Sequence, residues 1–141
     1  MIRRIAAVVL ALHGVAHTVG FVASFQLGDY AGKAVDTTLL WGRLDIGLPA
    51  TQAMGSGWLL LAVAFVACAV LLWRDARSAI RILAVFTVAS LAMSILASPA
   101  AIVGVGVNVA ILVGLVAYEI APRRATTSSS GSNTGPSIPI G

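Results

Sequence analysis

The sequence predicts an all-α membrane protein in which four transmembrane helices form an up-down bundle. Of its 141 residues, 59% are hydrophobic and only 10% are charged, and the mean hydropathy is +0.98. Water-soluble domains carry about 25% charged residues, so a soluble surface is excluded. The charges are also clustered, which leaves four long uncharged runs. Each run should be helical, because backbone groups in hydrocarbon have no water to bond and the alternation of barrel strands is absent.

Each of the four runs approaches the length of about 20 apolar residues that crosses a bilayer. We expect spans at about residues 5–25, 53–73, 79–97 and 101–121, within a transmembrane domain of residues 1–122. The first run follows two arginines, as a secretory signal would, but its length predicts an anchor that is retained. Pro122 ends the last span, because proline cannot continue the ladder of helical hydrogen bonds.

The segments outside the spans are one loop, short links and a tail. Residues 26–51 are expected to form an extracytoplasmic loop, in which residues 37–44 could make a short interfacial helix. Residues 55–57, Gly-Ser-Gly, are interpreted as a flexible start to the second span. Residues 123–141 consist mainly of Ser, Thr, Gly and Pro, which predicts a disordered cytoplasmic tail.

The basic residues predict the orientation. With the N-terminus in the cytoplasm, seven of the nine bases lie inside and only Lys33 and Arg43 lie outside. The positive-inside rule therefore favours an N-in, C-in protein with multiple passes through the bacterial cytoplasmic (inner) membrane. Bases beside apolar runs indicate the lipid bilayer as partner. No interleaving of basic and aromatic residues indicates nucleic acid.

Small residues recur every four positions in two spans. The third span carries Ser90, Ser94 and Ser98, and the fourth carries Gly106, Ala110 and Gly114. Helices in lipid associate through close packing and polar contacts, so these stripes are expected to bring backbones together. The packing could occur within one chain, between copies in a homo-oligomer or against other membrane subunits.

His13 and His17 are the residues of the first span that most need an explanation. Four residues apart on a helix, they point the same way, whereas the opposite face, with Val8 and Val15, is aliphatic. Titratable side chains in a membrane span cost free energy and usually face the interior of the bundle. The histidine face is therefore expected to point toward other helices.

Polar side chains of other spans are expected at the same depth in the membrane as the histidines. At about 1.5 Å per residue from the cytoplasmic ends, His17 lies roughly 18 Å deep, Ser90 roughly 16 Å and Asn108 roughly 20 Å. We therefore predict a polar cluster near the middle of the bilayer, made of His13, His17, Thr87, Ser90, Ser94 and Asn108.

Three interpretations of this cluster are open. Neutral histidines that bond across helices would make the protein a structural or accessory membrane component. A proton relay would make it a subunit of a small oligomeric transporter or proton-linked channel, because four spans are few for a pathway in one chain. A metal or haem site would need further ligands, since neighbours on one helix approach from one side and Cys68 lies at another depth. No metal, haem or other cofactor is predicted.

Enzyme motifs are absent from the sequence. Gly104-Val-Gly106 lies within a span and is not followed by Lys-Ser/Thr, there is no HExxH, and no Ser-His-Asp set shares a depth. Cys68 is the only cysteine, so an intrachain disulfide is excluded, and it is expected to act as a small hydrophobic residue. The sequence therefore predicts a protein that is not an enzyme.

The segment Leu12-His13-Gly14-Val15-Ala16-His17 resembles the first helix of a group of small bacterial four-helix integral membrane proteins with an HGxxH motif. Gly104 and Asn108 match a Gly-x-x-x-Asn element in the last helix of that group. The resemblance covers residues 5–121 in layout and implies a four-helix membrane fold, but no established activity. The layout is also similar to that of DoxX-like proteins in architecture, which does not give a function.

Overall fold

A computed structural model describes residues 1–74 and 78–120. Within this part of the chain, the main elements are α1 (Ile2–Ser24), α2 (Gly47–Trp73), α3 (Ala79–Leu96) and α4 (Ile102–Ile120). The connection between α1 and α2 holds a short 3-10 helix, η1 (Gly28–Tyr30), and a hairpin of β1 (Thr38–Leu39) and β2 (Leu44–Asp45). All four α-helices are long and apolar enough to cross a membrane.

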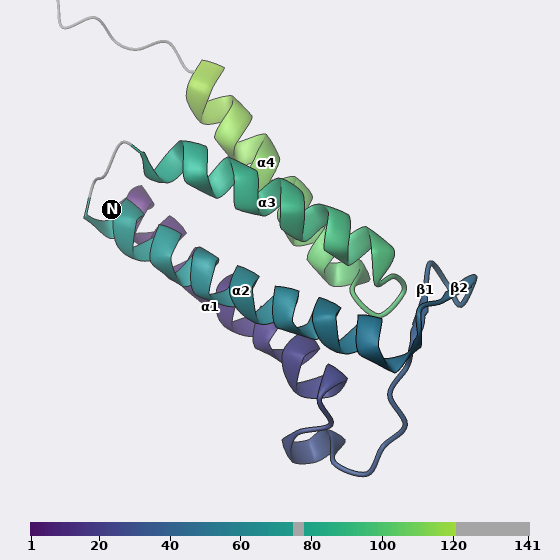
Figure 1. Cartoon of the computed structure of the whole chain (residues 1–141). Coiled ribbons are helices and arrows are strands. Elements are labelled where there is room, and N and C mark those ends of the chain that lie inside the picture. The colour runs from purple at the N-terminus through teal and green to yellow at the C-terminus, as the bar shows by residue number, and fades with distance from the viewer. Residues whose placement is uncertain (75–77, 121–141) are drawn as a thin grey trace, which may run out of the picture.

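The helices form two pairs. Successive helices run in opposite directions, α1 packs on α2, and α3 packs on α4 (Figure 1). Contacts between α2 and α3 join the pairs. The N-terminus lies at one end of the molecule, and the hairpin and the turn between α3 and α4 lie at the other (Figure 1).

Glycines allow α1 and α2 to approach closely. A Cβ atom added at Gly14 would lie 2.9 Å from the Cβ of Phe65 and 3.0 Å from the carbonyl oxygen of Ala62. At the other end of the interface, a Cβ at Gly55 would lie 2.5 Å from the Cβ of Ser24. Neither glycine could carry a side chain without displacing the neighbouring helix, so the sequence itself sets this short separation.

The second helix begins earlier than the expected start at residue 53. It starts at Gly47, so residues 55–57 lie inside a regular helix and are not a flexible segment, and the loop is shorter than residues 26–51. Pro49 falls in the first turn, where its missing N–H costs no helical hydrogen bond. The carboxylate of Asp45 accepts a hydrogen bond from the N–H of Gly47 at 2.9 Å and satisfies one donor at the helix start.

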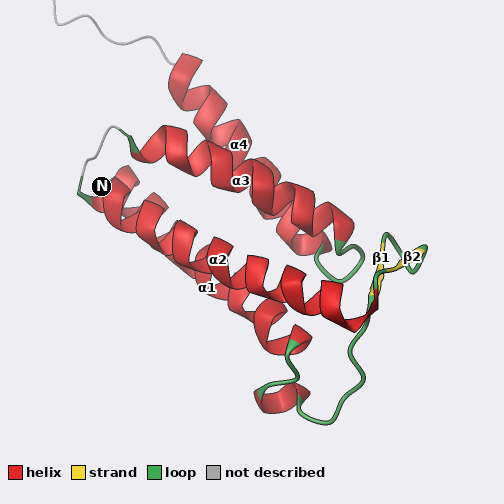
Figure 2. Cartoon of the chain, viewed as in Figure 1, coloured by secondary structure: helices red, strands yellow, loops and turns green. Residues whose placement is uncertain are grey.

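Residues 37–44 do not form an interfacial helix. Thr38 pairs with Asp45 and Leu39 with Leu44 in an antiparallel hairpin, seen as the yellow strands in Figure 2. At its tip, Leu40 and Trp41 adopt left-handed backbone angles, with φ of 51° and 59°.

Bonds to α3 account for the shape of this tip. The N–H of Leu40 donates to the carbonyl of Leu96 and that of Trp41 to the carbonyl of Ser98, both at 2.9 Å. The carbonyl of Leu96 ends α3 and has no partner within the helix, and that of Ser98 lies in the turn just beyond it, so the hairpin supplies donors to both.

The remaining helices begin and end within three residues of the expected positions, and the predicted tail of residues 123–141 lies outside the described residues. The serine stripe of α3 is buried, but the stripe of Gly106, Ala110 and Gly114 is exposed. An added Cβ at Gly106 or Gly114 would meet no atom within 4 Å. Instead, α4 approaches α3 at Gly104, where a Cβ would lie 3.0 Å from the Oγ of Ser94.

Candidate functional site

Aromatic side chains of α2 pack against the two histidines of α1. Both are buried, whereas Val15 on the opposite face of α1 is 57% exposed. The imidazole rings meet edge to face at 4.5 Å between centroids. Phe65 lies 4.9 Å from His13 and 5.3 Å from His17, and Trp58 lies 5.1 Å from His17. These rings restrict both imidazoles to one orientation.

Asn108 of α4 connects the histidines to α3 and is fully buried, at 0% exposed. Its Nδ2 donates to the carbonyl of Gly104 at 2.9 Å and to the Oγ of Ser90 at 2.9 Å, with a longer contact of 3.4 Å to Ser94. Its Oδ1 lies 3.3 Å from the Nε2 of His13. Because a carbonyl can only accept, the atom facing Gly104 must be the amide nitrogen, which fixes the orientation of the Asn108 amide.

This orientation assigns the protons of both neutral histidines. The Oδ1 of Asn108 only accepts, so the Nε2 of His13 carries a hydrogen and donates it. Ser90 already accepts from Asn108, and its hydroxyl lies 2.7 Å from the Nε2 of His17. Within the described residues this hydroxyl makes no other hydrogen bond, so its proton points to His17. Neutral His17 then carries its own hydrogen on Nδ1.

Five of the six residues that the sequence singled out are joined by these contacts: His13, His17, Ser90, Ser94 and Asn108. Thr87 is buried at the same face of α3, but its hydroxyl donates to the carbonyl of Leu83 in its own helix at 2.7 Å. Thr87 makes no side-chain hydrogen bond to the other five in the described chain. We call the five joined residues the polar cluster.

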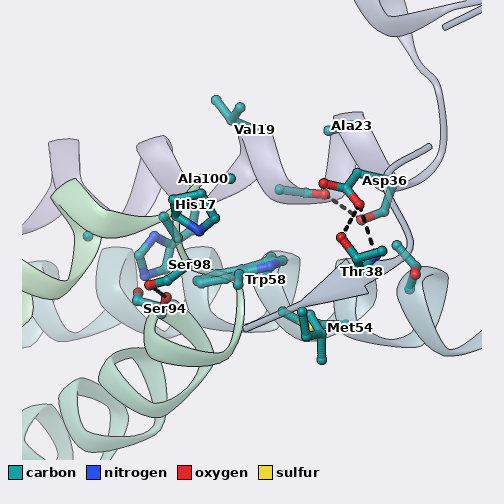
Figure 3. Close-up of a pocket in the computed structure, with 18 of the residues that line it drawn as sticks. His17, Val19, Ala23, Asp36, Thr38, Met54, Trp58, Ser94, Ser98 and Ala100 are labelled. Carbon is teal, nitrogen blue, oxygen red and sulfur yellow. Dashed lines mark hydrogen bonds between the residues drawn. The ribbon is translucent and has the colours of Figure 1, made fainter. Parts of the chain in front are cut away.

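A cavity of about 790 Å³ lies beside the polar cluster. It is bounded by α1, by the start of α2, by the turn between α3 and α4, and by the loop with its hairpin (Figure 3). His17 and Trp58 lie at its inner part and Asp36 and Thr38 at the loop side (Figure 3). The cavity therefore runs from the loop to the histidines.

The expected span of residues 53–73 would put Trp58 near one end of the helix, and the sequence offers no reason to include it in a site. The earlier start of α2 at Gly47 puts Trp58 three turns inside the helix, on the face toward α1. Its side chain is only 8% exposed and packs against Gly20, where an added Cβ would lie 2.6 Å from the indole ring. The signal that could have revealed it is the pairing of a bulky residue with a glycine on the neighbouring helix.

The loop end of the cavity carries a negative charge. The carboxylate of Asp36 accepts hydrogen bonds from the hydroxyl of Thr38 at 2.7 Å and from its N–H at 2.9 Å (Figure 3). These bonds lower the pKa of Asp36. Bonds from Thr37 and from the N–H of Gly47 likewise lower the pKa of Asp45. Both carboxylates are therefore ionised at neutral pH.

The described residues contain no group of three or more His, Cys, Asp or Glu side chains placed to hold a metal ion. Cys68 of α2 has a free thiol that is buried in the hydrophobic core. In comparisons with protein-family models, curated proteins and solved structures, nothing matches this chain. The polar cluster and the cavity are therefore the features from which a function can be inferred.

Proposed function

We propose that this chain is a multi-pass protein of the bacterial inner membrane that acts as a structural or accessory membrane component. The observation that supports this proposal is the closed hydrogen-bond network of the polar cluster. Through it, Asn108 of α4 and Ser90 of α3 hold the two histidines of α1. No catalytic role is assigned to any of these groups.

The energetics of polar groups in lipid favour a structural role. An unpaired polar group in hydrocarbon is costly, whereas an interhelical hydrogen bond contributes only about 1 kcal/mol. Among the described residues, every enclosed side-chain nitrogen or oxygen has a hydrogen-bond partner. The bonds from α1 to α3 and α4 therefore add modest stability, and they penalise any rotation of α1 that would break them.

The orientation that we propose is N-in and C-in, with the hairpin and the loop end of the cavity outside the cytoplasm. The end of the molecule away from the hairpin carries Arg4, whose guanidinium lies 5.4 Å from the ring centroid of Trp73. Arg3, Arg74 and Arg81 belong to the same end of the described chain, whereas the loop carries two basic residues, Lys33 and Arg43. This excess of basic residues away from the loop supports the proposed orientation through the positive-inside rule.

An alternative function is a subunit of a small oligomeric transporter or proton-linked channel. The cavity favours this alternative function, because the cavity leads from the loop to His17 and histidine exchanges protons near neutral pH. A pathway would need further copies or subunits, since in the described part of the chain the cavity lining does not extend beyond His13 toward the N-terminus of α1.

Proton flux into liposomes separates the two functions. We expect liposomes containing the wild-type protein to take up protons no faster than empty liposomes under an imposed potential, as followed with an enclosed pH-sensitive dye. In parallel, Asn108→Leu should lower the free energy of unfolding by about 1–3 kcal/mol, because His13 and Ser90 lose their partner.

Val109→Leu is the matched control, since Val109 is its exposed neighbour on α4. Wild-type proton flux that disappears in His17→Phe would overturn the structural proposal and establish the alternative.

A further inference from the structure

The cavity has the size and depth of a ligand site. Its volume of about 790 Å³ lies within the range of roughly 300–1,000 Å³ that is typical of small-molecule pockets. Its lining follows α1 from Ser24 to His13, a rise of about 16 Å along the helix. A molecule of lipid dimensions could therefore lie in it from the loop to the polar cluster.

Most of the wall is apolar, which excludes a charged ligand body. Apart from the two histidines, Asp36 at the loop end is the only acidic or basic side chain that the described residues contribute to the lining. Apolar side chains cover the middle of the cavity, among them Val19, Ala23, Met54, Val103 and Val107. A ligand in contact with these groups gains by removing its own apolar surface from water.

Two N–H groups in this wall lack an acceptor. The indole Nε1 of Trp58 makes no hydrogen bond within the described residues, although the side chain is only 8% exposed. The Nδ1 of His17 has no partner in the same part of the chain, and the network gives it the hydrogen. Because enclosed nitrogens and oxygens in the described residues are all partnered, neither atom is fully enclosed, and the residues of both line the cavity.

We propose that this cavity binds a neutral, lipid-soluble molecule with an apolar body and an acceptor oxygen, such as a ketone or an ester. The apolar body would lie along Val19 and Ala23, and the oxygen would accept a hydrogen bond from the indole N–H of Trp58. His17 lies beside it, with its ring centroid 5.1 Å from that of Trp58. This binding site is independent of the structural role of the polar cluster, because the N–H that it uses is one that the network leaves open.

The test compares 1-phenyl-1-decanone with decylbenzene, two probes of similar shape of which only the first has a carbonyl. The purified full chain, in detergent micelles loaded with equal amounts of either probe, is followed by its thermal unfolding. The ketone should raise the unfolding temperature with an apparent affinity at least about fivefold above that of the hydrocarbon, the gain expected of one added hydrogen bond.

Substitutions test whether the ketone binds in this cavity. Trp58→Phe keeps an aromatic ring but removes the N–H, so the preference for the ketone should be lost, whereas Trp73→Phe in the same helix, outside the lining, should keep it. Ala23→Leu fills the cavity without touching either donor and should abolish the stabilisation by both probes. Ala92→Leu, on an exposed position of α3, should leave the stabilisation unchanged.

Several outcomes would overturn the proposal. Equal stabilisation by the two probes would indicate a groove for acyl chains that does not select an acceptor oxygen. A ketone effect that survives Trp58→Phe or Ala23→Leu would place the binding elsewhere. The absence of any ketone effect on the wild-type chain would show that the cavity does not bind this class of molecule.

Discussion

Ser90 is the residue through which three helices of this protein are connected. Its hydroxyl accepts a hydrogen bond from Asn108 of α4 at 2.9 Å and lies 2.7 Å from His17 of α1, to which it donates. Ser98 is a natural comparison, since it is buried near the end of the same serine stripe. Its hydroxyl donates only to the carbonyl of Ser94, at 3.0 Å in the preceding turn.

Ser90→Ala should therefore destabilise the protein more than Ser98→Ala does. Loss of the Ser90 hydroxyl leaves two buried groups without this partner and should lower the free energy of unfolding by about 1–3 kcal/mol. Loss of the Ser98 hydroxyl should cost less, about 1 kcal/mol, because it removes a single hydrogen bond within one turn and no bond between helices. Equilibrium unfolding of the two variants in mixed micelles measures both values, and equal losses would contradict the network described above.

At this scale the sequence gives the face and the depth of a side chain but not its choice of partner. Helical spacing puts His13 and His17 on one face, and the structure joins them to Ser90 and Asn108. Thr87 has the same depth and face, yet its hydroxyl bonds to its own helix. A hydroxyl in a helix always has a backbone carbonyl within reach, and only the neighbouring helix decides between the two partners.

At the scale of helices, glycines differ in whether they lie at a close contact between two helices. Gly14 of α1 lies against Phe65 and the backbone of Ala62, so its missing side chain is what allows the two helices to approach. Gly106 of α4 has nothing within 4 Å of the position of a Cβ atom. Both are helical glycines in apolar spans, and the sequence offers no means to tell them apart.

Gly14→Ala and Gly106→Ala should therefore act in opposite directions. At Gly14 the added methyl must push α2 away, which should lower the free energy of unfolding by about 1–3 kcal/mol. At Gly106 alanine meets no neighbour and restricts the unfolded chain, so stability should be unchanged or higher by up to about 1 kcal/mol. Unfolding of both variants under identical micelle conditions gives the comparison, and a larger loss at Gly106 would refute this account of the packing.

Hydropathy predicts helices well where apolar residues are continuous and poorly where they are not. The apolar runs predict four helices, and the described part of the chain has four of sufficient length and apolarity to cross a membrane. The start of α2 was misplaced because residues 47–57 are rich in Gly, Ala and polar residues, which give no apolar run. The hairpin was missed because its tip is held by bonds from Leu40 and Trp41 to α3, more than 50 residues away in the chain.

For the whole molecule, labelling of single cysteines tests the proposed N-in, C-in orientation. In a Cys68→Ala background, Ala31→Cys should react with a membrane-impermeant maleimide in intact cells, because Ala31 is exposed in the loop. Ser78→Cys, exposed next to α3, should react only after the cells are permeabilised. The reverse pattern would show that the N-terminus lies outside and would overturn the proposed orientation.

The docked hairpin has a mechanical consequence for the two helix pairs. The loop leaves α1 and returns into α2, yet its tip is fastened to Leu96 and Ser98 at the end of α3. The α3 and α4 pair cannot move away from the α1 and α2 pair at this end unless the two bonds break or the hairpin moves with it. Because the hairpin also forms part of the cavity wall, access from the loop side is coupled to the spacing of the pairs. The segment that connects α1 to α2 therefore also holds the two helix pairs together at this end of the bundle.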